Sequence, residues 1–412
     1  MKTRLMNKQG IRLGLLFLLL APPALAAEEA ATLDTSTPQA VSSDPTHIIE
    51  HTIQAGMRAF QAAHYDRAIK HFQKAMQLAN QADKPALAAA AQVDLANALL
   101  ESAIQDEHSD GLAQLDQAIT AYRAALAVFT PEAMPELWAL VSNKLAFALC
   151  TKGTYLGGSE GMALLQEATT EFRDSLKVRT REAMPDAWAE TQNNLASALQ
   201  AMGNQTLGEQ GDAYLQEAVD RYLKALGEVS HADEPARWAQ IQDNLGRALW
   251  DQSVRASVTP DMELALLEQA ISTFRAALEV RTANSYPQAH AQTRHNLAEV
   301  LNNFAYNLTR LPARHAEAAV ALEEALQINP DNPYYLDSQG WLAYQQGDLD
   351  KAETLLQQSL AKLPHPQHAS HLAEVYWKKG QLKAAQQLLT RMLKQFPNDG
   401  DLLMAQQQLV ED

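Results

Sequence analysis

Residues 185–199 read PDAWAETQNNLASAL, and this stretch recurs along most of the chain. Each copy begins with a proline and keeps its small and apolar residues at the same offsets. The copies begin at Pro135, Pro185, Pro235 and Pro287, with a weaker one at Pro85, so the period is about 50 residues. A motif that returns at a fixed period predicts a repeat protein, in which one structural unit is stacked many times.

A second pattern lies between these copies. Ala118, Tyr122 and Ala125 are small, aromatic and small residues at steps of four and three, which places them on one face of a helix. The pattern returns at Ala168, Phe172 and Ser175, at Ala218, Tyr222 and Ala225, and at Ala270, Phe274 and Ala277. We therefore expect each repeat to be two amphipathic helices, which bury their apolar faces only by stacking on neighbouring repeats.

Shorter repeats flank the long ones. Residues 336–364 and 372–397 carry Leu, Gly, Tyr, Ala and Pro at the spacing of the tetratricopeptide-repeat (TPR) family, and residues 56–75 do so near the N-terminus. The chain resembles this family over roughly residues 48–397. The resemblance implies an all-α, right-handed superhelical solenoid of about eight helix–turn–helix repeats. The long repeats resemble the class that includes kinesin light chains, and residues 332–341 resemble repeats of bacterial envelope TPR proteins.

The predicted organisation follows these repeats. It comprises a signal peptide at 1–26, a disordered leader at 27–47, a TPR at 48–84, long repeats at 85–330, two standard TPRs at 331–398 and a capping helix at 399–412. The long repeats exceed the usual length of about 34 residues. We expect the excess to form Gly-rich loops between the two helices, as at 154–161 and 203–211. These loops are either solvated spacers or binding elements.

The first 26 residues have the features of a cleaved export signal. Four basic residues precede an apolar core at 13–20, and Ala24-Leu25-Ala26 supplies the small-x-small pattern of a cleavage site. The core is shorter than the about 20 residues that a membrane span needs. We therefore expect cleavage after Ala26 and a periplasmic or secreted protein without membrane insertion. The leader is rich in Ala, Thr, Ser and Pro, a composition typical of disorder.

The net charge limits the classes of partner, and the cysteine content limits the possible disulfides. The net charge is −16, and loss of the signal would change it to −20. Such a surface repels phosphate backbones and anionic lipids, so nucleic acid and membranes are disfavoured as partners. Cys150 is the single cysteine, so an intrachain disulfide is excluded. Its apolar neighbours indicate a core residue.

No sequence motif for catalysis or cofactor binding is present. The chain has no Gly-rich phosphate loop, HExxH, GxSxG or paired-cysteine motif. A helical-repeat rod also lacks the enclosed cleft that enzymes use, so we expect neither an enzyme nor a cofactor. His365, His368 and His371 are three residues apart and form the best candidate for a metal site. Because His365 lies between two prolines, surface histidines at a repeat junction are the favoured interpretation.

The TPR resemblance implies a concave groove lined by the first helix of each repeat. Carried over to this sequence, the groove positions are Asn193, Asn194, Asp243, Asn244, Arg247, His295, Asn296, Tyr334, Asp337, Trp341, Tyr344 and Trp377. Asparagine amides both donate and accept hydrogen bonds, so a row of them could pair with an extended peptide. A solvated helix face or bonding between helices is an equal alternative. The basic pair that clamps a terminal carboxylate in chaperone-binding TPR domains is missing, since Lys144 and Arg247 are isolated.

These observations favour a protein–protein interaction scaffold of the bacterial envelope, which holds a partner peptide or helix in its groove. A self-assembling structural repeat protein is the second hypothesis. A metal-binding protein that uses the three histidines is the third.

Overall fold

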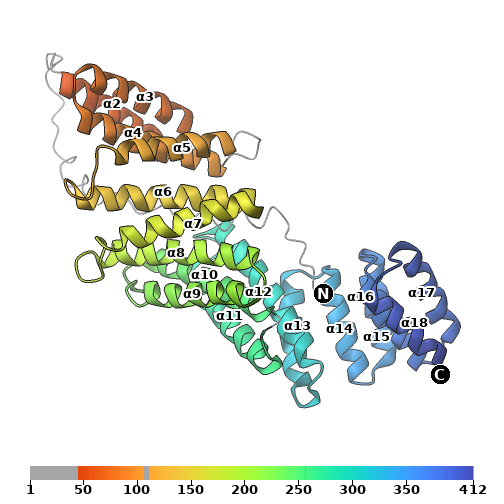
Figure 1. The fold of residues 1–412 in the computed structure, drawn as a ribbon. Coiled ribbons are helices and arrows are strands. Elements are labelled where there is room, and N and C mark those ends of the chain that lie inside the picture. Colours follow the sequence, from red (N-terminus) through yellow and green to blue (C-terminus); the bar gives the residue numbers. More distant parts are fainter. Residues whose placement is uncertain (1–44, 106–110, 256, 412) are drawn as a thin grey trace. The chain divides into compact units, whose positions relative to one another are not determined.

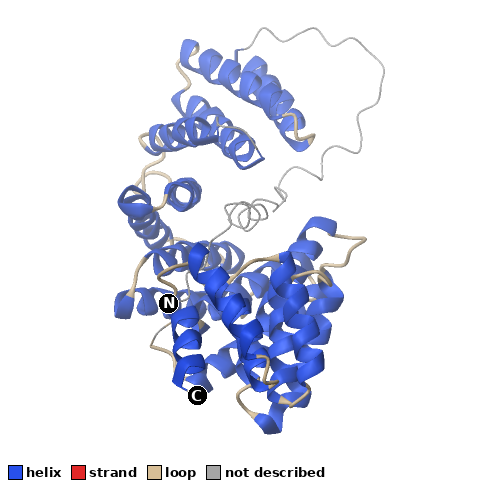
Figure 2. Cartoon of the chain, turned by 90° about the vertical axis from the view of Figure 1, so that its right-hand side faces the viewer, coloured by secondary structure: helices blue, strands red, loops and turns tan. Residues whose placement is uncertain are grey.

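The computed structural model describes residues 45–105, 111–255 and 257–411. All regular elements in these ranges are helices, so the predicted all-α class is confirmed (Figure 2). The predicted signal peptide and most of the predicted leader lie outside the described residues. Helix α2 begins at Pro45, so the last three residues of the stretch predicted as leader, 45–47, are helical.

The chain divides into two compact units, Met1–Glu234 and Pro235–Asp412. In the first unit each helix packs against the next, and the helices form four successive antiparallel pairs (Figure 1). The pairs are α2 (Pro45–Gln61) with α3 (Tyr65–Gln81), α4 (Pro85–Gln105) with α5 (Gly111–Leu126), α6 (Pro135–Leu156) with α7 (Gly158–Ser175), and α8 (Pro185–Gln205) with α9 (Gly208–Leu226).

The second unit contains four more pairs and a final helix. The pairs are α10 (Pro235–Ser253) with α11 (Pro260–Val280), α12 (Pro287–Leu308) with α13 (His315–Ile328), α14 (Pro333–Gln345) with α15 (Leu349–Lys362), and α16 (Pro366–Lys378) with α17 (Leu382–Gln395). A short 3₁₀ turn, η1 (Pro312–Arg314), precedes α13. The last helix, α18 (Gly400–Glu411), packs against α16 and α17. The described residues thus contain eight helix pairs, as the repeat count predicts.

The extended loops predicted inside the long repeats are absent from the described residues. Helix α6 ends at Leu156 and α7 begins at Gly158, while α8 and α9 are separated by two residues. The extra length lies in both helices of a pair. The first helices have 22 residues in α6 and 21 in α8 against 13 in α14, and the second helices have 18 in α7 and 19 in α9 against 14 in α15. Glycines permit the long helices of a pair to pack closely, because they lie at the points where the two helices touch. A Cβ on Gly153 would meet the Gly161 carbonyl oxygen at 2.8 Å.

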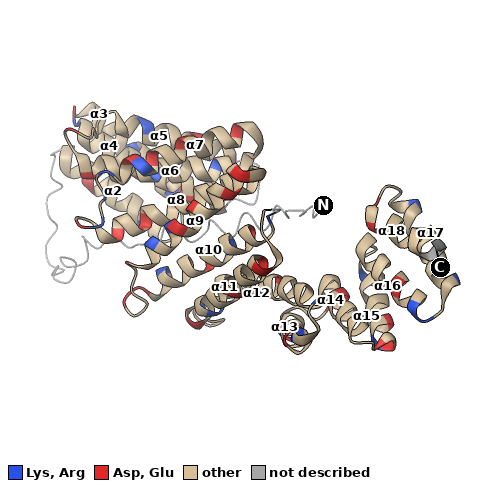
Figure 3. Cartoon of the chain, turned by 60° about the horizontal axis from the view of Figure 1, so that its bottom comes forward, with Lys and Arg blue, Asp and Glu red and all other residues tan. Residues whose placement is uncertain are grey.

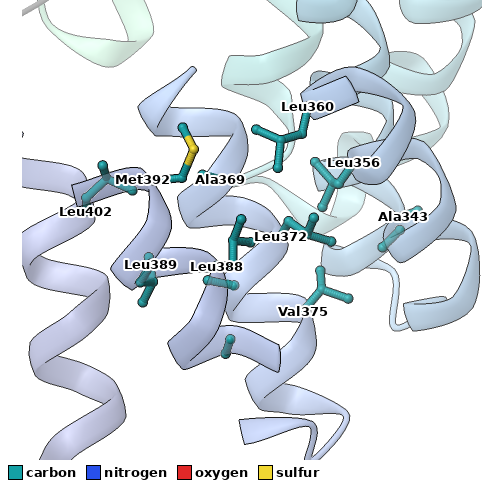
Figure 4. Packing of buried hydrophobic residues seen from close by; sticks show 13 residues of the cluster. Ala343, Leu356, Leu360, Ala369, Leu372, Val375, Leu388, Leu389, Met392 and Leu402 are labelled. Atoms are coloured by element: carbon teal, nitrogen blue, oxygen red, sulfur yellow. The ribbon is translucent and has the colours of Figure 1, made fainter. Parts of the chain in front are cut away.

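The core of each repeat is made of the small and aromatic residues that the pattern singled out. Ala118, Tyr122 and Ala125 on α5 are fully buried, and so are their equivalents on α9 and α11. The Tyr122 hydroxyl donates to Asn97 Oδ1 at 2.7 Å, so the buried phenol is paired. In the second unit, leucines such as Leu356, Leu372 and Leu389 interdigitate between α15, α16 and α17 (Figure 4).

Cys150 lies in the core. It is buried as predicted, and burial raises the pKa of its thiol to about 12, which leaves it unreactive at neutral pH.

Among the described helices, α4 is long and apolar enough to cross a membrane. Half of its most apolar window is buried inside the protein, where α4 packs between α3 and α5. Its apolar character is therefore explained by the core.

Candidate functional site

One face of α14 carries most of the aromatic residues predicted for the groove. Tyr334, Asp337, Trp341 and Tyr344 are spaced by three, four and three residues, which places them on one helical stripe. Asp337 is the single charged residue of this helix. Figure 3 shows how sparse the charges are along α12 and α14. Tyr334 is 45% exposed, and Trp341 and Tyr344 are half-buried.

Trp341 is stacked against two other rings. Its ring lies 4.8 Å from that of Tyr344, at an interplanar angle of 19°. On α16, the His371 ring lies 4.2 Å from Trp341 at 17°. His371 is held in turn by Asp337, whose carboxylate oxygens lie 2.9 and 3.1 Å from its Nδ1. The stack therefore joins the first helices of two successive repeats.

The hydroxyl of Tyr344 extends this connection. It donates to Glu374 Oε1 on α16 at 2.8 Å. Burial and the nearby Glu374 both raise the pKa of Tyr344 well above its usual range, so the phenol stays protonated and remains a donor. Because Glu374 lies one turn after His371, α16 presents both side chains to α14.

Helix α12, the first helix of the preceding repeat, contributes further residues next to those of α14 and α16. Glu299 and Tyr306 lie seven residues apart on one face. The Tyr306 ring is 6.1 Å from that of His371, and Gln367 Nε2 donates to its hydroxyl at 3.2 Å. Glu299 Oε1 accepts from the buried Tyr335 of α14 at 2.8 Å. We define the aromatic–carboxylate surface as the set Glu299, Tyr306, Asp337, Trp341, Tyr344, His371 and Glu374.

The polar residues predicted for the groove in the long repeats are placed differently. Asn193, Asn194, Asp243, Asn244 and Asn296 are between 2% and 5% exposed. These side chains are enclosed within the folded protein, so almost none of their surface is open to a partner. Of the remaining predictions, His295 is exposed and Arg247 is half-buried.

Most of these buried polar groups have partners inside the protein. Asn193 Nδ2 donates to Asn194 Oδ1 at 3.3 Å, and Arg247 Nη2 donates to Asn244 Oδ1. Asn296 accepts from Gln292 at 3.0 Å. Each of these bonds joins residues of the same helix, and the burial of the side chains contradicts a solvated face.

Among these buried polar residues, Asp243 contacts three other side chains. Thr293 Oγ1 donates to Asp243 Oδ1 at 2.9 Å. The guanidinium groups of Arg281 and Arg247 each lie 3.5 Å from Asp243 Oδ2. The carboxylate thus compensates two arginines within the second unit.

The three C-terminal histidines are only partly brought together, because the rings of His365 and His368 lie 4.9 Å apart whereas His371 bonds to Asp337. Within the described residues no group of three His, Cys, Asp or Glu side chains is placed to hold a metal ion. His368 is buried and bonds through Nδ1 to Ser359 Oγ at 2.9 Å, and burial lowers its pKa. His365 caps α16 and packs edge-on against Tyr334, at 5.8 Å between ring centroids. Trp377 is half-buried and has no ring stack within the described residues.

The first unit contains a polar cluster that was not predicted from the sequence. Asp94 on α4 and Lys144 on α6 occupy the repeat position of Asn194, and Glu101 lies two turns after Asp94. Burial raises the pKa of Asp94 to about 6 and that of Glu101 to about 7, while Lys144 lowers both. Burial lowers the pKa of Lys144 itself. Aligning all five copies at this position would have revealed the Asp–Lys neighbours.

Known proteins are similar to parts of this chain. Residues 343–409 match the family model of the tetratricopeptide repeat. Over 77 residues, 19% of the chain, the sequence is 42% identical to a TPR repeat-containing protein of Pseudomonas aeruginosa. The chain spans 13% of the length of that relative.

Solved structures also match at low identity. YrrB, described as a TPR protein with an unusual peptide-binding site, has a TM-score of 0.36 and 17% identity, covering 57% of this chain and 97% of its own. PilF of Pseudomonas aeruginosa has a TM-score of 0.39 and 16% identity, covering 65% and 99%. TPR proteins are typically non-enzymatic scaffolds for protein–protein interaction. The family match thus assigns residues 343–409 to the tetratricopeptide repeat, and the described residues before them form helix pairs of the same all-α kind.

Proposed function

We propose that this protein is a scaffold of the bacterial envelope, and that it binds a segment of a partner protein on the aromatic–carboxylate surface of α12, α14 and α16. The observation that carries the proposal is the position of Trp341. Its ring is half-buried on the first-helix face, stacked against Tyr344 and His371, rather than enclosed in the core between helix pairs. Tryptophan and tyrosine held in this way are the residues that contribute most to binding at protein interfaces.

The side chains of this surface are held in place by bonds within the protein, without a bound partner. Tyr344 is fixed by Glu374, and His371 is fixed by Asp337. All of these residues lie on helices instead of loops. Binding therefore costs little conformational entropy, which favours affinity at a modest contact area.

The envelope location rests on residues 1–26. Their basic start, apolar core and Ala-x-Ala site support export of a protein that begins near Ala27. N-terminal sequencing of protein from the expressing cell tests this part. Recovery of a chain that still begins at Met1 would contradict it.

Photo-crosslinking tests the binding surface. A photoreactive phenylalanine derivative at Tyr334, which is 45% exposed on the α14 stripe, should capture a partner in the native cell. The same group at Tyr155, 53% exposed on α6, is the matched control. Addition of Trp341→Leu to the Tyr334 probe should abolish the specific crosslink. Equal capture with and without Trp341 would place partner binding elsewhere.

A second function is favoured by the C-terminal end. Leu382 on α17 and Leu403 and Met404 on α18 are 55%, 40% and 57% exposed. Such side chains on the last helices could stack on another copy, as in the self-assembly hypothesis. Solution mass at several concentrations decides this, because self-assembly requires a mass that rises with concentration and falls after Met404→Glu.

A further inference from the structure

We propose that the aromatic–carboxylate surface recognises an arginine side chain of the bound segment. This inference rests on the proposed binding function and specifies its partner chemistry. A guanidinium group is flat and cationic, so it stacks on aromatic faces and forms hydrogen bonds to carboxylates at the same time. The surface offers both kinds of group on three adjacent helices.

The two outer carboxylates are not neutralised within the described part of the chain. Glu299 accepts one hydrogen bond, from Tyr335, and Glu374 accepts one, from Tyr344. Both bonds reach Oε1, and neither carboxylate forms an ion pair with a described Lys, Arg or His. Each therefore keeps an acceptor oxygen and an uncompensated charge. An arginine is the side chain that satisfies such a carboxylate most fully.

The positions of these carboxylates suit a stacked cation. Glu299 lies on α12 and Glu374 on α16, and α14 with Trp341 packs against both of these helices. Because the Trp341 ring is already stacked by Tyr344 and His371, a guanidinium would stack on the half-buried Tyr344 ring, whose hydroxyl group contacts Glu374. The fold already uses this chemistry, since the Arg310 guanidinium lies 6.0 Å from the Tyr306 ring centroid.

Besides Arg310, Lys378 is a basic residue near the surface, and its charge opposes the proposed ligand. Lys378 lies four residues after Glu374 on α16, so it shares the helical face of that carboxylate. It is exposed and makes no ion pair with any described residue. Its charge should reduce the affinity for a cation, which provides a variant that is expected to strengthen binding.

The test uses the full mature chain and fluorescent peptides of defined chemistry. An arginine hexapeptide is compared with a citrulline hexapeptide, which has the same shape without the charge, and with a lysine hexapeptide. Binding is followed by anisotropy, and the indole signals of ¹⁵N-labelled protein locate the contact. The arginine peptide should bind with at least about five-fold higher affinity than the lysine peptide, and it should shift the Trp341 indole signal.

Site variants establish whether this binding uses the surface. Glu374→Gln should weaken binding of the arginine peptide by about five-fold to thirty-fold, which corresponds to one charge-assisted bond. Trp341→Leu should weaken it by a similar factor, because it removes the ring that holds Tyr344 in place for the cation–π contact. Lys378→Gln should strengthen it about two-fold. Glu160→Gln and Tyr155→Leu remove an exposed carboxylate and an exposed aromatic ring of the first unit, and they should change nothing. Circular dichroism confirms that each variant is folded.

Several outcomes overturn the inference. Equal affinity for the citrulline or lysine peptide removes the role of the guanidinium. An unchanged affinity in Glu374→Gln and Trp341→Leu means that the peptide binds elsewhere on this acidic protein. A partner that crosslinks at Tyr334 through a segment without arginine also overturns it, but leaves the proposed binding function intact. Absence of any specific crosslink from the Tyr334 probe in the otherwise wild-type protein would instead contradict the proposed binding function.

Discussion

Arg281 donates a hydrogen bond from Nη1 to Thr293 Oγ1 at 2.9 Å, and both side chains are buried. In the first unit, Arg179 and Thr191 form the same bond at 3.0 Å. The two pairs occupy one position of the repeat, because arginine and threonine are twelve residues apart in each. A buried guanidinium needs further compensation, which Asp243 supplies for Arg281 and Glu190 for Arg179.

The intervening repeats fill these positions with apolar residues. Phe129 and Val141 stand there in one repeat, and Val229 and Ile241 in another, and all four are buried. The repeat thus tolerates either an apolar pair or an arginine–threonine pair. A single exchange within a pair leaves polar groups without partners, whereas a complete exchange does not.

The first prediction uses this relationship. Arg281→Val alone should lower the free energy of unfolding by about 3 kcal/mol, because it removes a partner of the buried Asp243 carboxylate. Arg281→Val combined with Thr293→Ile and Asp243→Asn should recover most of that loss, since Asn is the residue at the equivalent position 193. Urea unfolding measures both. A triple variant less stable than the single one would contradict the proposed equivalence.

The fold was predictable because the repeat pattern is also the packing pattern. Ala118, Tyr122 and Ala125 are recognisable from their spacing, and the same residues are buried between helices. The interhelical connections were predicted wrongly for a local reason. Glycines and polar residues near 154–161 and 203–211 have the composition of a loop. Their role as close-contact positions between two helices depends on a neighbour that sequence alone does not place.

The second prediction tests that close contact. Gly153→Ala should lower the free energy of unfolding by about 1–3 kcal/mol, because its Cβ would meet the Gly161 carbonyl oxygen at 2.8 Å and backbone cannot easily move away. Gly227→Ala is the control, since the nearest atom to its Cβ would be 3.5 Å away. Thermal unfolding compares the two. Similar melting temperatures would mean that α6 and α7 separate more readily than the contact suggests.

The third prediction concerns pH and the cluster of Asp94 and Glu101. Folding raises their pKa values from 3.8 and 4.5 to about 6 and about 7. The folded state therefore binds more protons than the unfolded state between about pH 4 and 7, and stability falls as the pH rises through this window. Lys144, Glu190, Arg179 and Tyr122 also belong to this network.

Neutral replacements isolate the carboxylates from those other groups. Asp94→Asn with Glu101→Gln should flatten the pH dependence relative to wild type and raise stability at pH 8 by about 1 kcal/mol, after allowance for solvent screening. Asp116→Asn is the control, because it removes an exposed carboxylate of the same unit. Unfolding curves from pH 4 to 8 provide the measurement. Parallel curves for wild type and the double variant would show that these carboxylates titrate normally.

The candidate site was only partly predictable. Tyr334, Asp337, Trp341 and Tyr344 could be placed on one face of α14 from spacing alone. Their partners could not, because His371 and Glu374 come from the next repeat and are brought close by helix packing. For the asparagines, the predicted accessibility to a partner was wrong, since their side chains are at most 5% exposed. Packing inside the folded protein covers these asparagines, and it depends on neighbouring helices that spacing alone does not place.

The last prediction separates stability from binding. Asn194, Asn244 and Asn296 are at most 5% exposed, and each accepts a hydrogen bond inside the protein. Their joint replacement by alanine should therefore lower the free energy of unfolding by about 1 kcal/mol per site, while the affinity for a partner captured at Tyr334 stays within about two-fold. Trp341→Leu should have the opposite profile, with a small loss of stability and at least about ten-fold weaker binding.

Titration of that partner against both variants, together with urea unfolding, gives the two profiles. The contrast follows from burial, since a side chain enclosed between helices can contribute to a complex only through the fold. If the alanine variant lost affinity at unchanged stability, the amides would have to reach the partner directly. The packing around these side chains would then have to open on binding, because the amides have almost no exposed surface.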